Sequence, residues 1–183
     1  LQHAEALALA DEVEKAVYTH GTMTLPDGRQ VFAYETDGYG NHLFMDDANV
    51  PSLLGLAYLR AVPAGSPLWQ ATAQAVWSDA NPWFFSGKAA EGIGGPHIGE
   101  GQVWPMSIIL RALSSSDEAV IAGALKTLRA THAGTGFMHE AFDKDDPNKF
   151  TRAWFAWVNG LFGELVVKVA NERPHLLAAD YGA

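Results

Sequence analysis

The 183-residue sequence contains no cysteine. This absence excludes disulfide frameworks, thiolate zinc sites and a cysteine nucleophile, and it is compatible with a reducing compartment. Charged residues are scarce at 18%, against about 25% in typical globular domains, and 12 Lys and Arg face 21 Asp and Glu. An acidic chain without a basic cluster is poorly suited to binding nucleic acid or an anionic membrane surface.

Long hydrophobic runs are also missing. The best candidate for a membrane span, residues 154–170, contains Asn159, Glu164 and Lys168, whereas a spanning helix needs about 20 apolar residues. The opening residues show no signal-peptide pattern, so a cytoplasmic location is expected. With 48% apolar residues, the length predicts a single domain over residues 1–183 with a buried core.

The periodicity of apolar residues predicts a mostly helical chain. Six helices are expected, over residues 5–19, 51–60, 67–79, 105–113, 117–131 and 151–171, and the last is apolar nearly all round, which predicts burial. Ser66 and Pro67 mark one helix start, and Ser115 with Glu118 predicts a capping box at another. The only strands expected form a small β-hairpin near residues 22–36, around the turn signal Pro26-Asp27-Gly28.

The helices at residues 51, 105 and 151 start at a loose period of about 50 residues. This spacing is compatible with stacked helical hairpins and equally with three unrelated hairpins in a bundle. In the stacked arrangement, the polar loops that precede these helices converge at one mouth.

Three loops carry the candidate chemistry. In residues 41–49, Asp46 and Asp47 precede a helix start; one carboxylate suffices as a cap, which leaves the other free to bind hydroxyls or act as an acid or base. Residues 81–99 are too rich in glycine for a helix or strand and too aromatic for a flexible linker, and they contain His97. In residues 134–147, Glu140 follows a glycine turn between aromatic residues, where it is either a solvated glutamate or a carboxylate oriented for proton transfer.

Tryptophans lie in or beside these loops. Trp83, Trp104, Trp154 and Trp157 are each compatible with a place in the core. Their shared location beside carboxylates and amides also suits a sugar, which has apolar C–H faces and hydroxyl edges. No set of His, Asp and Glu has a convincing metal-ligand spacing, so neither a metal nor another cofactor is expected.

Three segments resemble hallmark sequences of glycoside hydrolase family 125. They are NHLFMDDANVPSLL at residues 41–54, FFSGKAAEGIGGPH at residues 84–97 and GTGFMHE at residues 134–140. The resemblance covers about residues 25–165. It implies an (α/α)₆ toroid and a metal-independent, inverting exo-α-1,6-mannosidase, acting on α-mannosides of the N-glycan type.

The resemblance also implies roles for individual residues. Glu140 falls on the glutamate that the family assigns as the general base. Hydroxyl contacts are expected from Asp47, Asn49, His97 and His139, and Trp154 is a candidate wall of the sugar site. The general acid is expected in an N-terminal part of the family that this chain does not resemble.

Six helices form only about half of a twelve-helix toroid. The exposed inner surface then needs a cover, either a missing N-terminal half or a second copy of the chain. The isolated chain is expected to be inactive because it lacks the acid. Two other functions remain open: a sugar epimerase on the same kind of toroid, with His97 and His139 as acid and base, or a carbohydrate-binding module without catalysis.

Overall fold

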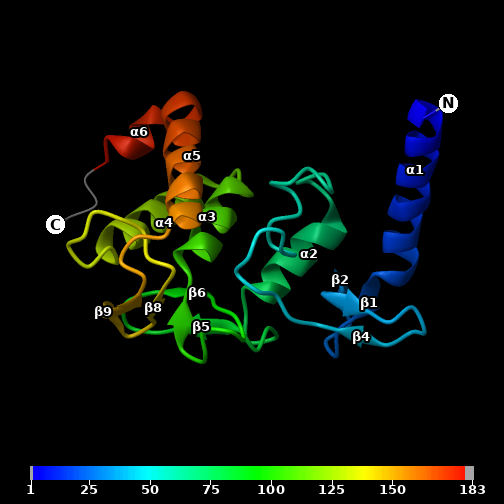
Figure 1. Ribbon diagram of the computed structural model, residues 1–183, viewed down its shortest axis with the longest axis horizontal. Helices are drawn as coiled ribbons and strands as arrows, with labels where there is room; N and C mark the ends of the chain where they lie inside the picture. The colour runs from blue at the N-terminus through cyan, green and yellow to red at the C-terminus, as the bar shows by residue number, and fades with distance from the viewer. Residues whose placement is uncertain (1, 180–183) are drawn as a thin grey trace.

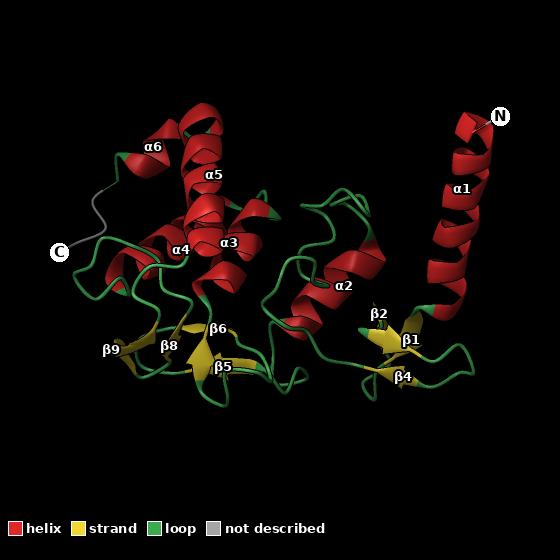
Figure 2. Cartoon of the chain, viewed as in Figure 1, coloured by secondary structure: helices red, strands yellow, loops and turns green. Residues whose placement is uncertain are grey.

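The computed structural model describes residues 2–179, of which Figures 1 and 2 show the arrangement. The fold is mostly helical, with 40% helix and 15% strand in small antiparallel sheets. The helices are α1 (Gln2–His20), α2 (Pro67–Val76), α3 (Pro105–Leu113), α4 (Glu118–Ala130), α5 (Ala156–Glu172) and α6 (Pro174–Leu177). The strands are β1 (Thr22–Thr24), β2 (Gln30–Phe32), β3 (Glu35–Thr36), β4 (His42–Leu43), β5 (Phe84–Ser86), β6 (Glu91–Ile93), β7 (Gln102–Val103), β8 (Ala141–Asp143) and β9 (Asp146–Thr151).

Helix α3 is the centre of the core. Eight of its nine residues are buried, and it contacts both α4 and α5. Each neighbour presents one apolar stripe at three- and four-residue spacing. The stripes are Ile121, Ala124, Leu125 and Leu128 on α4, and Val158, Leu161, Leu165 and Val169 on α5.

The start of α2 matches its prediction. The Ser66 side chain accepts a hydrogen bond from the Trp69 N–H at 3.4 Å, with Pro67 at the first helical position. The predicted capping box of α4 is wrong. Asp117 is the cap, because its Oδ1 accepts from the Ala119 N–H at 2.8 Å, while Ser115 Oγ accepts from the Asp117 N–H at 3.0 Å.

The predicted hairpin near residues 22–36 is confirmed as the antiparallel pair β1–β2. However, three further small sheets follow, β3–β4, β5–β6 and β7–β8–β9. The glycine-rich loop that we expected to be irregular contains β5 and β6. Its glycines permit close packing: a Cβ on Gly92 would lie 2.6 Å from Val103 Cγ1 of the neighbouring sheet.

The predicted helix over residues 51–60 does not form; the segment is a series of turns. Side chains take its first amides: Asp46 accepts from Leu53 and Leu54, and Ser52 Oγ accepts from the Gly55 N–H at 3.0 Å. Such local side-chain acceptors compete with a helix, and Gly55 lowers helix propensity further. The first of the three expected helical hairpins therefore lacks its first helix.

The last long helix also differs from its prediction. It starts at Ala156 because residues 146–151 pair with β8 as β9. It is not buried all round, since Trp157 is 43% and Val167 61% exposed. One face of α5 therefore lies open.

Helix α1 stands at the opposite end of the molecule from α3–α6 (Figure 1). None of its residues is buried, and its apolar side chains Leu7, Leu9, Val13 and Val17 are exposed. Figure 2 shows that β5, β6, β8 and β9 lie together below α3 and α5. Within residues 2–179, no helix is both long and apolar enough to cross a membrane.

Candidate active site

The small sheet β7–β8–β9 fixes the backbone of Glu140. In its register Ala141 lies opposite Thr151, and the Glu140 N–H donates to the Thr151 carbonyl oxygen at 3.3 Å. Glu140 therefore leaves the sheet at a defined point, directly before β8.

The Glu140 side chain is only 12% exposed and carries two contacts on one oxygen. The Thr151 hydroxyl donates to Oε2 at 3.2 Å, and Arg152 Nε forms an ion pair with the same atom at 3.3 Å. Buried polar groups in proteins are typically held by such partners. Among the described residues, no donor contacts Oε1.

A continuous row of rings leads from Arg152 to the glycine-rich loop. The Arg152 guanidinium lies 5.3 Å from the centre of the Phe155 ring. Phe155 packs edge-on against Trp104 with their ring centroids 6.2 Å apart, and Trp104 packs edge-on against His97 with ring centroids 5.0 Å apart. Trp104 is almost fully buried, while the His97 side chain is 48% exposed.

His97 connects this row to the third loop. Its Nδ1 lies 3.9 Å from Asp47 Oδ2, and Asn49 donates through Nδ2 to Asp47 Oδ1 at 2.7 Å. Gly95 allows the approach, because a Cβ there would lie 2.7 Å from Asp47 Oδ1. Burial raises the pKa of Asp47, and the nearby His97 opposes this rise. One row of contacts thus connects Asp47, Asn49 and His97 with Glu140.

Asp46 has a structural place, but it accepts from the amides of a turn, because the helix that it was expected to cap does not form. Its side chain is fully buried, and its oxygens accept from the Leu53 and Leu54 N–H groups, each at 2.9 Å. Burial raises the pKa of Asp46 to about 7, although the two backbone hydrogen bonds oppose the rise. Asn81 holds the Asp46 backbone by donating to its carbonyl and accepting from its N–H.

His139 is placed differently from the expectation of a hydroxyl contact. The residue is 1% exposed, and its ring stacks on Phe150 with ring centroids 3.9 Å apart. Its Nδ1 lies 3.0 Å from the Ala153 carbonyl oxygen. Its Nε2 is buried without a partner among the described residues, and burial lowers its pKa. The ring has no accessible nitrogen for a ligand, so it supports the Glu140 loop instead. Trp154, in contrast, is 58% exposed.

Comparison with known proteins identifies the family of the chain. The family model described as metal-independent alpha-mannosidase (GH125) matches residues 2–167. The chain belongs to glycoside hydrolase family 125. The matched region includes the loops that contain Asp47, His97 and Glu140.

Two similar proteins give the scale of the match. The meiotically up-regulated gene 157 protein of Schizosaccharomyces pombe is 47% identical over 173 residues, which are 94% of this chain and 34% of that protein. A metal-independent α-mannosidase of Streptococcus pneumoniae was solved as a non-productive substrate complex with α-1,6-mannobiose. It matches with a TM-score of 0.89 and 38% identity, over 93% of this chain and 40% of that one. The chain thus spans well under half the length of either.

Sequence reasoning did not single out Thr151, Arg152 or Phe155, because all three fall in the helix expected over residues 151–171. Trp104 was named only among the tryptophans that suit either the core or a sugar site. The feature that would have indicated Thr151 and Arg152 is the β-hairpin over residues 141–151, whose register brings Thr151 opposite Ala141. That pairing is a tertiary property that the local pattern does not display.

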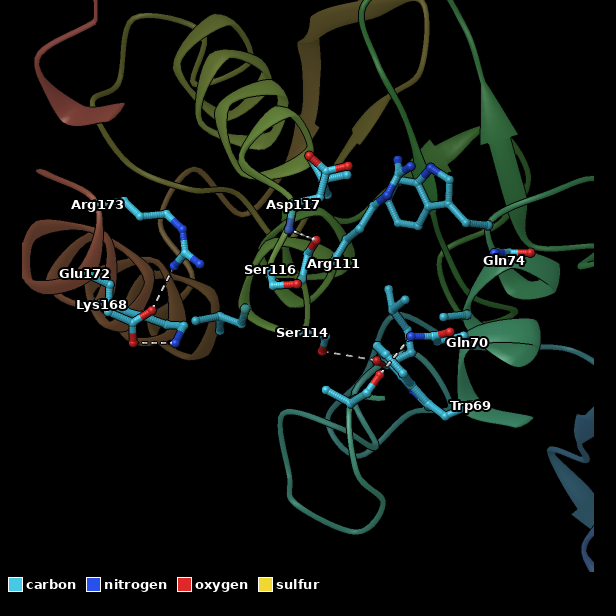
Figure 3. A pocket seen from close by; sticks show the side chains of 17 residues that line it. Trp69, Gln70, Gln74, Arg111, Ser114, Ser116, Asp117, Lys168, Glu172 and Arg173 are labelled. Atoms are coloured by element: carbon cyan, nitrogen blue, oxygen red, sulfur yellow. Dashed lines mark hydrogen bonds and ion pairs between the residues drawn. The ribbon is translucent and has the colours of Figure 1, made fainter. Parts of the chain in front are cut away.

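A cavity of about 780 Å³ lies elsewhere, between α2, the residues before α4 and the end of α5 (Figure 3). None of the predicted site residues lines it. Its charged groups pair with one another or with nearby side chains, as in Lys168–Glu172 at 2.7 Å and Arg173–Glu172 at 2.9 Å. Asp117 caps α4. With its carboxylates engaged in this way, the cavity is a poor candidate for glycoside hydrolysis.

Among residues 2–179, no group of three or more His, Asp or Glu side chains is placed to hold a metal ion. The contact row itself contains two carboxylates, Asp47 and Glu140. Asp47 Oδ1 is occupied by Asn49 and Glu140 Oε2 by Thr151 and Arg152. The carboxylate oxygens of this arrangement can hydrogen-bond to hydroxyls and transfer protons.

Proposed function

We propose that this chain is the part of an inverting exo-α-1,6-mannosidase that carries the general base, Glu140. The observation that supports this most directly is the placement of Glu140: the carboxylate is largely buried, is held at Oε2 and has no donor at Oε1 among the described residues, in the region that the family 125 model matches. A general base needs an oxygen within hydrogen-bonding reach of the attacking water. The Oε1 atom of Glu140, which has no donor among the described residues, is the oxygen proposed for this role.

The proposed reaction removes a terminal α-1,6-linked mannose. Glu140 takes a proton from a water that attacks the anomeric carbon, while a carboxylic acid on the opposite face protonates the departing glycosidic oxygen. Inversion requires the two carboxyl groups to be roughly 6.5–9.5 Å apart so that the water fits between them. The product is β-mannose, because the attack inverts the α configuration.

In this proposal the sugar lies beside the row from Asp47 to Glu140. Asp47, Asn49 and the half-exposed His97 contact hydroxyls, and the exposed Trp154 ring forms a wall against the apolar face of the sugar. The α-1,6-mannobiose in the Streptococcus pneumoniae complex supports this substrate class, and that structure is described in terms of N-linked glycan processing. We therefore propose N-glycan-type α-mannosides as substrates.

The general acid is proposed to lie outside these 183 residues. Asp46 is committed to two backbone amides, and Asp47 is engaged by Asn49 and His97. The relatives extend well beyond the matched region. We propose that this further polypeptide supplies the acid and covers the open faces of α1 and α5, which completes an (α/α)₆ toroid.

A sugar epimerase is the less favoured alternative. It would need His97 and His139 as an acid–base pair, and His139 has no accessible ring nitrogen. A carbohydrate-binding module without catalysis would bind mannosides through the same hydroxyl contacts and leave the linkage intact.

The test compares the isolated chain with a family 125 polypeptide extended to the length of its relatives, using α-1,6-mannobiose. Proton NMR of the first product formed by the extended protein should show β-mannose, and the isolated chain should release little or none. Formation of α-mannose would contradict inversion, and intact mannobiose bound without hydrolysis would favour the binding module. Rapid release by the isolated chain would move the general acid to Asp46 or Asp47.

A further inference from the structure

The hydroxyl of Thr151 has its hydrogen-bonding capacity directed by the sheet. Its Oγ1 accepts from the Ala141 N–H at 3.2 Å and donates to Glu140 Oε2 at 3.2 Å. A hydroxyl has one proton and two lone pairs. Because the amide N–H occupies the acceptor side, the single proton is directed to the carboxylate.

Arg152 approaches the same oxygen from the residue that follows β9. Its backbone has φ +45°, in the left-handed region that non-glycine residues adopt rarely. This turn ends the strand, and the guanidinium lies over Phe155 with Nε 3.3 Å from Glu140 Oε2. The Arg152 side chain is 62% exposed, and exposed ion pairs contribute little free energy on their own. Thr151 is also exposed, but its hydroxyl is held by two hydrogen bonds, one from the Ala141 N–H and one to Glu140 Oε2.

Both contacts converge on Oε2, and none of the described residues donates to Oε1. We infer that Thr151 is a positioning residue, assisted by Arg152, which holds Oε2 so that Oε1 is the oxygen that takes the proton from the attacking water. This inference rests on the proposed role of Glu140 as the general base. Without the hydroxyl, the carboxylate rotates among orientations, and only some of them place a free oxygen at the water.

The experiment compares Thr151→Val with Thr151→Ser in the extended protein, with α-1,6-mannobiose as substrate. Valine keeps the branched shape that suits a strand but removes the hydroxyl, whereas serine keeps the hydroxyl. A misplaced catalytic group lowers turnover by up to about 10²-fold. We expect valine to lower kcat roughly 10- to 100-fold with KM nearly unchanged, and serine to retain most of the turnover.

Controls separate positioning from folding. The circular-dichroism spectrum and melting temperature of each variant are measured, and Asp145→Asn on the adjacent exposed turn serves as the matched surface change. If Thr151→Val does not fold, Thr151→Ala against Thr151→Ser gives the same comparison.

The kinetic results for Thr151 test its positioning role, and those for Glu140 test the proposed base. A valine variant with unchanged kcat, or a serine variant as impaired as valine, would overturn the positioning role. A rise in KM of roughly 10- to 100-fold with kcat retained in the valine variant would also overturn it, since that result indicates lost substrate binding. Near-normal turnover of Glu140→Gln in the same protein would remove the proposed base itself, and the two failures are therefore distinguishable.

Discussion

Asp46 and Glu140 are both buried loop carboxylates, yet their surroundings differ in kind. Asp46 is fully buried, and each of its oxygens accepts from a backbone amide of the turn at residues 53–54. Glu140 keeps 12% of its side chain exposed and is held by side chains at one oxygen alone. A carboxylate saturated by backbone donors organises a loop, whereas one anchored at a single oxygen retains an oxygen for chemistry.

The largest expected effect is on turnover after Glu140→Gln. Glutamine keeps the shape and hydrogen bonds but cannot accept the proton from water, and positioned acid–base groups contribute about 10²–10⁴-fold. In the extended protein, kcat should fall by at least that range while mannoside binding is nearly retained. Steady-state kinetics and calorimetric binding of α-1,6-mannobiose measure the two separately. Asp145→Asn, on an exposed turn, should change neither.

The converse change is Asp46→Ala, which should affect stability instead. It leaves the buried amides of Leu53 and Leu54 without acceptors, at about 1–3 kcal/mol for each unsatisfied group. The free energy of unfolding of the 183-residue chain, measured in urea, should fall accordingly. Glu140→Gln should leave it nearly unchanged. Equal losses in the two variants would erase the contrast between the two carboxylates.

A smaller effect should appear in the pH dependence of stability. Burial raises the pKa of Asp46 to about 7, above its value in the unfolded chain, so the folded state binds more protons between about pH 4 and pH 7. The stabilisation is fully present below pH 4 and is lost as the pH rises to 7. The melting temperature of Asp46→Asn should vary less over this window than that of the unmodified chain. A contribution that increases with pH would mean that the backbone hydrogen bonds outweigh burial.

The smallest expected effect is that of a chelator. The described residues contain no group of three or more His, Asp or Glu side chains placed to hold a metal ion. Treatment with EDTA should leave both the melting temperature and mannoside binding unchanged. A drop of many degrees would show that a metal ion supports one of the loops.

Local pattern predicted much of the helical fold. The helix at residues 105–113 was predicted with its observed bounds, and those at 67–79 and 117–131 differ by one to three residues at their ends. These helices have apolar stripes and start signals within their own sequence. The segment at residues 51–60 has a similar apolar pattern, but its amides are taken by side chains that include Asp46, seven residues from Leu53.

The candidate site was predictable where its residues lie in long signature segments. The family resemblance indicated Glu140, and Asp47, Asn49 and His97 were expected to contact hydroxyls; the structure connects all four in one row. The local sequence could not indicate that His139 is buried. Thr151 and Arg152 were missed because their relation to Glu140 depends on strand pairing across ten residues. The glycine-rich segment that contains Gly92 was expected to be irregular, yet its glycines allow β5 and β6 to pack closely against their neighbours.

The most direct test of Glu140 as the base of an inverting mannosidase is azide rescue of Glu140→Gln in the extended protein. A small anion can replace the water and needs no base, so attack from the same face should give a β-mannosyl azide, detected by proton NMR. The account predicts that azide restores consumption of α-1,6-mannobiose with this product. An α-configured azide, or near-normal turnover of Glu140→Gln without azide, would contradict it.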